Sequence, residues 1–417
     1  MKLRIDNVAL IKHAEIDIDG ITVIAGNNNS GKSTVGKILF SMFNALNNLD
    51  DKIQKQRVEQ LTDAVRYSFF ETAKEEWRVG RFSVIHYIVR RVLDNIESGK
   101  IGWESIFASL VEKFDLELSD EIKEKLQKEV EDVCTWPKDR LLLDSLQTSF
   151  SGVFNGQINS LYQTGSEAKI DLFIKDALTS IAFQKNEIIH YSSEISLIHK
   201  AIYYSSPLVI DFIEGWRFPD VMTRNLCRLL IDYGDAITDD QNLFVQSMQQ
   251  GKLEVVLKKL KSVIPGQLVR DGRNYALELP NCGEPINLKN LSTGIKAFMV
   301  LKMLIEANLI KKRDVLILDE PEIHLHPSWQ LVYAEIIVLL QKEFDLSVVI
   351  TTHSNFFLDA IETYTKKYQT YDKLHLYLSE LKDGGVEMCE VTNSAEAIYS
   401  KMADALDVLD FERLSMN

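Results

Sequence analysis

The chain has 417 residues, 46% of them hydrophobic, and a formal net charge of −14 at pH 7. This length can bury a large core and leaves room for more than one folded unit, whereas the negative balance excludes a chain whose whole surface binds nucleic acid, because phosphate neutralisation needs clustered lysine and arginine. The four cysteines show no paired spacing, which indicates neither a zinc site nor a disulfide framework and favours a cytoplasmic location.

The amino-terminal segment contains three predicted strands. Alternating or continuous apolar residues mark 3–11, 14–18 and 21–25, and we expect the first two strands to pair in antiparallel fashion. This segment lacks the pattern of a signal peptide. No uninterrupted apolar run in the chain reaches the roughly 20 residues that a membrane span needs, so we expect a soluble protein without a membrane partner.

A glycine-rich loop stands between the third predicted strand and a predicted helix. The two glycines of this loop let the backbone curl so that its N–H groups face phosphate oxygens, Lys32 can reach the β and γ phosphates, and Ser33 can ligate magnesium. The flanking strand and helix are the context that this pattern requires, so the sequence predicts a site for ATP and Mg²⁺. The predicted binding residues are Gly26, Asn27, Asn28, Asn29, Ser30, Gly31, Lys32, Ser33 and Thr34.

The long middle part of the chain has a mostly helical pattern. Apolar residues recur at helical spacing over about 50–185 and again over 195–264, and one strand of the nucleotide-binding head is predicted near 186–192. The pattern therefore favours a head that is interrupted by a mainly helical insertion. The predicted parts are the first part of the head at 1–50, the insertion at 51–264 and the second part of the head at 265–417.

A second phosphate-binding candidate lies at the start of a strongly apolar predicted helix. Ser292 and Gly294 form a Ser-x-Gly entry, whose exposed N–H groups and positive dipole end suit an anion. Taken by itself, the same entry indicates only an ordinary helix N-cap.

Two predicted buried strands end in residues that suit phosphoryl transfer. The first, within 314–321, ends in Asp319 and Glu320: Asp319 is placed to hold the magnesium shell, and Glu320 to polarise the attacking water. The second strand, 346–352, is followed by His353, which could sense the γ-phosphate. Considered separately, the two acids could simply begin a turn and the histidine could be a capping or packing residue.

Together and in this order, these elements resemble the ABC-type ATPase heads of the SMC, RecF and OLD class. The stretch 322–327, with its ExHLHP form, is similar to OLD-like and AAA15-type ATPases of bacterial anti-phage systems, such as the ATPase subunits of Septu and PARIS. The implied fold class is α/β, a mixed sheet flanked by helices. A metal half-site formed by His324 and His326 is the alternative for this stretch, but no third ligand cluster is visible.

The resemblance implies a mechanism that a single copy cannot complete. Two heads would enclose two ATP molecules, with Ser292 and Gly294 of one copy touching the γ-phosphate held by the other, so we expect a homodimer or higher oligomer. The resemblance makes 291–296 the signature motif of these ATPases, and Ile295 stands where that motif usually has glutamate or glutamine. The glutamine of the magnesium-contacting loop cannot be placed, although 188–194 resembles the strand and loop that carry it. Turnover is therefore expected to be slow.

The residues after His353 hold no acid and histidine cluster of the kind found in nuclease domains. We therefore expect a separate effector protein, such as a nuclease, that this ATPase regulates in anti-phage defence. One alternative is a RecF-like or SMC-like head that binds DNA or RNA directly, for which 252–273 and 364–373 supply basic residues, although solvated helix faces also explain both. A nucleotide-gated scaffold and a transporter ATPase are the remaining alternatives.

Overall fold

The computed structural model divides the chain into two compact units, one made of Met1–Asn47 with Leu146–Asn417 and one of Asn48–Ser145. Much of the predicted helical insertion, including 64–88, 90–120 and 232–252, lies outside the described residues. The structure describes residues 1–47, 138–213, 217–231, 253–271 and 274–402, with the shorter pieces 54, 57–63, 89, 121, 124–125, 128, 132–133, 215 and 412–413.

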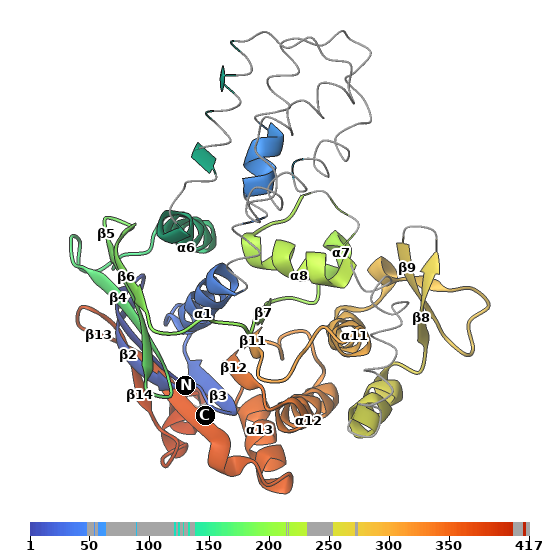
Figure 1. The fold of residues 1–417 in the computed structure, drawn as a ribbon. Coiled ribbons are helices and arrows are strands. Elements are labelled where there is room, and N and C mark those ends of the chain that lie inside the picture. Colours follow the sequence, from blue (N-terminus) through green and yellow to red (C-terminus); the bar gives the residue numbers. More distant parts are fainter. Residues whose placement is uncertain are drawn as a thin grey trace. The chain divides into compact units, whose positions relative to one another are not determined.

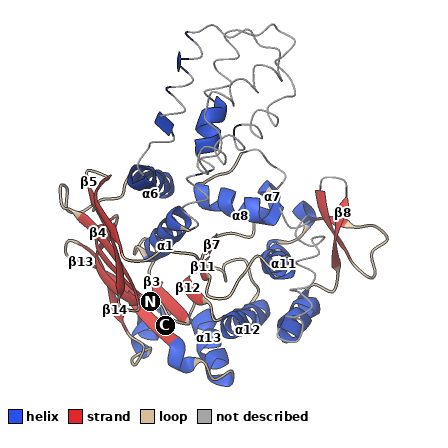
Figure 2. Ribbon diagram, in the orientation of Figure 1, coloured by secondary structure: helices blue, strands red, loops and turns tan. Residues whose placement is uncertain are grey.

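The first unit is built on a sheet of eleven strands, in the order β6-β5-β4-β1-β2-β14-β13-β3-β12-β11-β7 (Figures 1 and 2). A separate three-stranded sheet has the order β10-β9-β8. The strands of the large sheet are β1 (Lys2–Val8), β2 (Ile11–Asp17), β3 (Ile21–Gly26), β4 (Ala168–Ile174), β5 (Ala177–Gln184), β6 (Glu187–Ser193), β7 (Ala201–Tyr204), β11 (Val315–Asp319), β12 (Ser347–Thr352), β13 (Leu374–Lys382) and β14 (Gly385–Glu390). Those of the small sheet are β8 (Gln267–Asp271), β9 (Asn274–Glu278) and β10 (Ile286–Asn287).

Five neighbouring strands, β13, β3, β12, β11 and β7, run parallel to one another. Every residue of β3 and β7 is buried, as are most residues of β11 and β12. Strands that helices cover on both faces require such continuous apolar sequences. Because the carboxyl ends of parallel strands meet at one edge, the segments after β3, β11 and β12 lie near one another.

The opposite half of the sheet is largely antiparallel. β1 pairs with β2 in antiparallel fashion, as the sequence predicted, although the first strand ends at Val8 and the second begins at Ile11. The antiparallel pairs β1·β4, β4·β5 and β5·β6 extend the sheet from this hairpin. Lys185 and Asn186 connect β5 to β6 with positive φ angles, as a type I′ turn requires.

The predicted insertion at 51–264 needs a correction. Four strands within it, β4 to β7, belong to the large sheet, and the structure groups the chain from Leu146 onward with the nucleotide-binding unit. The second unit therefore starts at Asn48 and ends at Ser145. Helical spacing dominates the early middle part, and the short antiparallel strands that follow have no buried-strand pattern comparable to that of β3 or β11.

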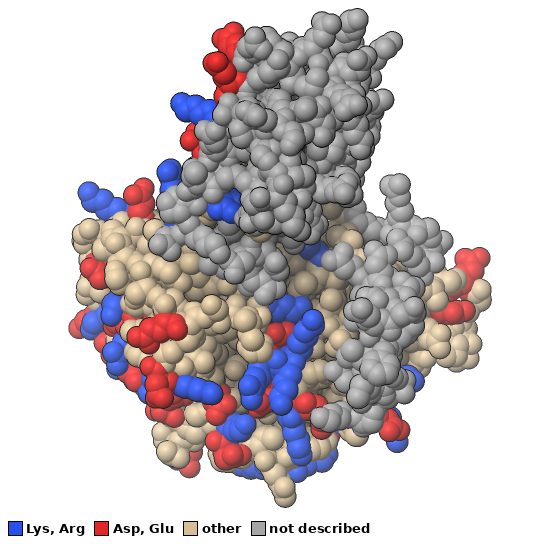
Figure 3. Space-filling model, in the orientation of Figure 1, with Lys and Arg blue, Asp and Glu red and all other residues tan. Residues whose placement is uncertain are grey.

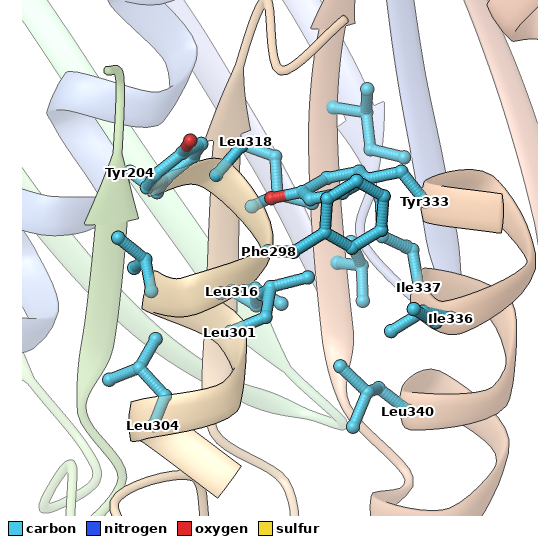
Figure 4. Packing of buried hydrophobic residues seen from close by; sticks show 14 of the residues in the cluster. Tyr204, Phe298, Leu301, Leu304, Leu316, Leu318, Tyr333, Ile336, Ile337 and Leu340 are labelled. Atoms are coloured by element: carbon cyan, nitrogen blue, oxygen red, sulfur yellow. The ribbon is translucent and has the colours of Figure 1, made fainter. Parts of the chain in front are cut away.

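Helices cover both faces of the parallel half of the sheet (Figures 1 and 2). Ile317 of β11 faces α1, whereas its neighbours Leu316 and Leu318 face the core formed with α11 and α12 (Figure 4). In this core the ring of Phe298 packs edge-on against Trp329 and Tyr333, with centroids 5.8 and 5.2 Å away. The helices are α1 (Lys32–Leu46), α6 (Lys138–Phe154), α7 (Val209–Phe212), α8 (Val221–Ile231), α11 (Thr293–Glu306), α12 (Pro327–Phe344) and α13 (Asn355–Lys367).

No helix among the described residues combines the length and the apolar composition that crossing a membrane demands.

Candidate functional site

The phosphate loop joins β3 to α1, as the sequence predicted. Gly26 has φ 149°, and a Cβ there would lie 2.6 Å from the carbonyl oxygen of Ser379. Gly31 has φ 74° and caps the amino end of α1. Both positions therefore need glycine, which gives the loop its curled backbone.

Lys32 points into this loop and is almost completely buried, with 4% of its side chain exposed. Its Nζ donates hydrogen bonds to the carbonyl oxygens of Gly26, at 3.0 Å, and Asn27, at 2.8 Å. Burial lowers the pKa of Lys32, and the nearby carboxylates of Glu320 and Asp319 oppose this shift. A buried cation thus lies under the loop that would receive phosphate.

Asp319, at the end of β11, is the centre of a hydroxyl cluster. Its Oδ1 accepts hydrogen bonds from Ser33 Oγ at 2.8 Å and from Thr351 Oγ1 at 2.5 Å. Its Oδ2 accepts one from the Tyr203 hydroxyl at 2.7 Å. A serine hydroxyl beside a carboxylate supplies the hard oxygen ligands that Mg²⁺ prefers, so the residues present fit this ion.

Glu320 adopts a left-handed backbone conformation with φ 50°. Its N–H donates to the carbonyl oxygen of Thr351 at 3.0 Å, which fixes the turn immediately after β11. Its Oε1 lies 3.9 Å from Lys32 Nζ and 3.5 Å from His353 Nδ1. A non-glycine residue pays an energetic cost of about 1–2 kcal/mol in this conformation, and here the turn directs the carboxylate toward the phosphate loop.

His353 follows β12 and also approaches Glu322. The Oε1 atom of Glu322 accepts hydrogen bonds from Thr352 Oγ1 at 2.5 Å and from the His353 backbone N–H at 3.3 Å. Only 3% of Glu322 is exposed, and this burial raises the pKa of its carboxyl group. The sequence placed Glu322 in the 322–327 motif but predicted no role for it. In the structure its carboxylate binds the end of β12 and the backbone of His353.

Ser292 and Gly294 stand at the start of α11. The Ser292 side chain accepts a hydrogen bond from the backbone N–H of Ile295 at 3.4 Å, so the helix-cap interpretation matches the geometry. A Cβ on Gly294 would lie 2.9 Å from the ring of Trp329, so α11 can approach α12 only with glycine there. Within the described ranges, no hydrogen bond or ion pair joins Ser292 or Gly294 to the phosphate loop of the same chain.

A buried lysine of α11 fixes this helix to α7, the short helix after β7. Lys296 Nζ donates to Asp211 Oδ1 at 2.6 Å and to the carbonyl oxygen of Lys289 at 2.9 Å. Only 5% of the Lys296 side chain is exposed, so this ion pair is shielded from solvent on one side.

His326 acts as a helix cap in the structure. The Nδ1 atom of His326 accepts the backbone N–H of Ser328 at 3.3 Å and caps α12, while His324 is exposed. No group of three or more potential His, Cys, Asp or Glu ligands occurs in the part of the chain that the structure describes.

The predicted place of the magnesium-contacting loop is wrong. Residues 188–194 overlap β6, which lies at the far edge of the sheet, ten positions away from β7 in the strand order. The strand beside β11 is β7, and Ser205 and Ser206 follow it instead of a glutamine. The wholly apolar sequence of β7, AIYY, is the signal that could have identified it as the covered strand.

An open cavity of about 370 Å³ lies beside the phosphate loop. Asn27, Asn28, Asn29 and Ser30 line one side, and Tyr162 and the end of β13 line the other. This cavity offers space next to the loop for the part of a nucleotide that extends beyond its phosphates.

Solved structures similar to this chain include SMC heads. One is the SMC head bound to the C-winged helix domain of ScpA, with 13% identity, coverage of 95% of this chain and 98% of that chain, and a TM-score of 0.44. The SMC head domain from Thermotoga maritima has 10% identity, coverage of 94% and 98%, and a TM-score of 0.41. The SMC head with an extended coiled coil, bound to the C-terminal domain of ScpA derived from Pyrococcus furiosus, has 10% identity, coverage of 99% and 98%, and a TM-score of 0.42.

A family model described as "AAA domain, putative AbiEii toxin, Type IV TA system" matches residues 21–359. This match includes the phosphate loop, Asp319, Glu320 and His353, and it agrees with the mixed sheet flanked by helices that the sequence predicted. The predicted α/β fold of a P-loop ATPase head is therefore confirmed. Because the match covers more than half of the chain, this protein belongs to the family of AAA domains described as putative AbiEii toxins of type IV toxin–antitoxin systems.

Proposed function

We propose that this protein binds ATP with Mg²⁺ and hydrolyses it slowly. The observation that carries the proposal is the convergence of three segments distant in sequence: the phosphate loop, the turn after β11 and the end of β12. They bring Ser33 Oγ within 2.8 Å of Asp319, and Glu320 Oε1 within 3.5 Å of His353 and 3.9 Å of Lys32. A cation, a magnesium ligand pair and a carboxylate base are the parts that phosphoryl transfer to water needs.

Each residue would have a separate task. Lys32 would exchange its two loop carbonyls for the β and γ phosphates, and the N–H groups of residues 26–34 would face the phosphate oxygens. Ser33 and Asp319 would hold Mg²⁺, which neutralises developing charge when bound. Glu320 would accept a proton from water as the water oxygen bonds to the γ-phosphorus, and the bond to the leaving ADP oxygen would break with its electron pair. His353 would contact the γ-phosphate from beside Glu320.

A second copy would complete the site. The Ser292 side chain is exposed, and no interaction ties it to the phosphate loop of its own chain within the described residues. Its position at the amino end of α11 leaves helix N–H groups available to an anion. We therefore propose that Ser292 and Gly294 contact the nucleotide held by the partner copy, in a homodimer or a higher oligomer.

The biological role that we propose is regulation of a separate effector, such as a nuclease, in anti-phage defence. Support comes from the family description, which names a toxin of a toxin–antitoxin system, and from the ExHLHP stretch after β11. The described residues after His353 include α13, β13 and β14, and no group of three or more His, Cys, Asp or Glu side chains that could hold a metal ion occurs among them.

The decisive experiment compares Glu320→Gln with the exposed control Glu396→Gln. If Glu320 is the base, its variant should lose roughly 10²- to 10⁴-fold in ATPase rate and keep ATP binding, whereas the control should match the wild type. Light scattering should then detect an ATP-dependent dimer of Glu320→Gln, and affinity capture of that dimer from its host should recover a stoichiometric effector. An unchanged rate in Glu320→Gln would contradict the assignment of the base.

Direct binding of DNA or RNA is the second candidate. Positive side chains form a stripe in the lower half of the face shown in Figure 3. In the basic segment 364–373, however, Lys366 lies over the ring of Tyr371 at 4.7 Å and Lys367 over that of Tyr364 at 5.3 Å, so these rings are engaged within the chain. A nucleic-acid-binding head would show ATP-dependent affinity that falls with salt, by about 0.9 log units per neutralised phosphate for each tenfold increase in salt.

A further inference from the structure

Tyr203 is a buried tyrosine whose hydroxyl reaches the candidate magnesium site. It lies on β7, beside β11, and is 2% exposed. Its hydroxyl donates to Asp319 Oδ2 at 2.7 Å, whereas Ser33 and Thr351 both donate to Oδ1. The two oxygens of the carboxylate are therefore held from different sides, and the Oδ1 side is the one shared with the predicted metal ligand Ser33.

The fold holds the Tyr203 ring in a narrow space. A Cβ on Gly36 would lie 2.6 Å from Cγ2 of Ile317 and 3.1 Å from the Tyr203 ring, so glycine at that position lets α1 lie this close to β11 and β7. The ring also meets Phe40 edge-on, with centroids 6.0 Å apart. Because α1 begins with the phosphate loop, the ring that contacts Asp319 is packed against the same helix that presents Lys32 and Ser33.

Tyr203 lies on β7, the strand beside β11, and not on the segment 188–194 that the sequence suggested for the magnesium-contacting loop. β7 is the parallel neighbour of β11, and residues 201–206 contain no glutamine. In the register of these strands Tyr203 is opposite Ile317, two residues before Asp319, and its long side chain spans that distance. A tyrosine hydroxyl thus reaches the carboxylate from the strand beside it.

We propose that Tyr203 is a positioning residue for the magnesium site, whose hydroxyl fixes Asp319 Oδ2 and so orients Oδ1, together with Ser33, toward the metal. This inference rests on the proposed binding of ATP with Mg²⁺. Groups that orient a metal ligand through a hydrogen bond commonly contribute 10- to 100-fold to metal affinity. The effect of Tyr203 should therefore appear in nucleotide binding only when Mg²⁺ is present.

The adjacent residue Tyr204 provides a matched control. It is equally buried, at 1% exposed, but it faces the opposite side of β7 and belongs to the hydrophobic core beside Phe298 and Tyr333 (Figure 4). Tyr203→Phe and Tyr204→Phe each remove one buried hydroxyl from the same strand. Only the first variant removes a hydrogen bond to Asp319.

The experiment measures the dissociation constant of a fluorescent, non-hydrolysable ATP analogue for the full chain, in Mg²⁺ and in EDTA. The ratio of the EDTA constant to the Mg²⁺ constant reports how strongly the metal supports binding. We expect Tyr203→Phe to reduce this ratio about 10- to 100-fold and to leave the EDTA constant unchanged. Tyr204→Phe should keep the wild-type ratio. Binding of Mn²⁺, followed by electron paramagnetic resonance with the same analogue, should weaken in parallel.

The outcomes separate this inference from the function on which it rests. A wild-type chain whose affinity for the analogue does not depend on Mg²⁺ would overturn both. A Mg²⁺-dependent wild type with an unchanged ratio in Tyr203→Phe, or with equal losses in both tyrosine variants, would overturn the positioning role alone.

A second readout covers the case in which Tyr203→Phe does not fold. Fluorotyrosine placed only at position 203 keeps the hydroxyl and gives one ¹⁹F resonance. That resonance should shift when Mg²⁺ joins the bound analogue, and a label at position 204 should shift much less. In a chain that binds the metal, the proposal would be contradicted by a resonance at position 203 that does not shift, or by one that shifts no more than the resonance at position 204.

Discussion

Gly36→Ala tests whether α1 and the candidate magnesium site depend on the same close packing. In an exposed helix interior, alanine would stabilise the chain by about 0.8–1 kcal/mol relative to glycine. In this chain the new Cβ would lie 2.6 Å from Cγ2 of Ile317 and 3.1 Å from the Tyr203 ring. Ile317 is fully buried and β-branched, so its methyl group has little freedom to move. Inserting a methyl group into such a packed site typically costs 1–3 kcal/mol.

The overpacking term should exceed the gain in helix propensity. Since the closest contact involves a rigid methyl group, we take the upper part of that range and expect a net loss of about 1–2 kcal/mol. At about 2.1 cal/mol/K of unfolding entropy per residue, a loss of this size in the unit formed by Met1–Asn47 and Leu146–Asn417 corresponds to a decrease in melting temperature of roughly 1.5–3 °C. Because the ring of Tyr203 must also move, Mg²⁺-dependent binding of ATP should weaken.

Urea denaturation and calorimetry measure the stability, and titration with the fluorescent ATP analogue measures the binding. Gly283→Ala is the control, because no atom lies within 4 Å of a Cβ at that position. It should be within about 0.5 kcal/mol of the wild type. A Gly36→Ala chain that is as stable as the wild type, or more stable, would refute the packing argument, because helix propensity would then have exceeded the cost of the contact.

Three further substitutions test other parts of the argument. Phe298→Ala removes a fully buried ring that packs on Trp329 and Tyr333, and it should cost about 3–5 kcal/mol in urea denaturation. Lys32→Ala should abolish measurable binding of the ATP analogue, and retained affinity would argue against the phosphate loop as the site. Burial raises the pKa of Glu322 in the folded chain, so the folded state holds this proton more tightly than the unfolded state and loses stability as pH rises above the unfolded pKa near 4.5. Glu322→Gln should therefore lose less stability than the wild type as the pH rises above 4.5; an identical pH dependence of the unfolding free energy would contradict this.

The parts of the site that could be predicted from sequence are those whose signal is local. The phosphate loop carries its glycines, Lys32 and Ser33 in one continuous segment. Asp319 and His353 directly follow apolar runs that only a covered parallel strand explains, and the carboxyl ends of such strands share one edge of the sheet. The proximity of these residues could therefore be predicted from the type of strand alone, without the order of the strands in the sheet. Their roles in catalysis stay predictions.

The parts that could not be predicted depend on which strand pairs with which. The sequence predicted a strand of the head near 186–192 and helices over 195–264, whereas the structure puts β6 at an exposed edge and makes 201–204 the strand beside β11. Even the correct choice of β7 would not have separated its two tyrosines, because successive side chains on a strand face opposite sides. Tyr204 enters the hydrophobic core, and Tyr203 reaches Asp319 over Gly36. The difference between a core tyrosine and a candidate magnesium-site tyrosine is thus set by the register of β7 on β11, which the sequence does not contain locally. For this reason Tyr203→Phe should weaken the Mg²⁺-dependent binding of the nucleotide, whereas Tyr204→Phe should leave it unchanged.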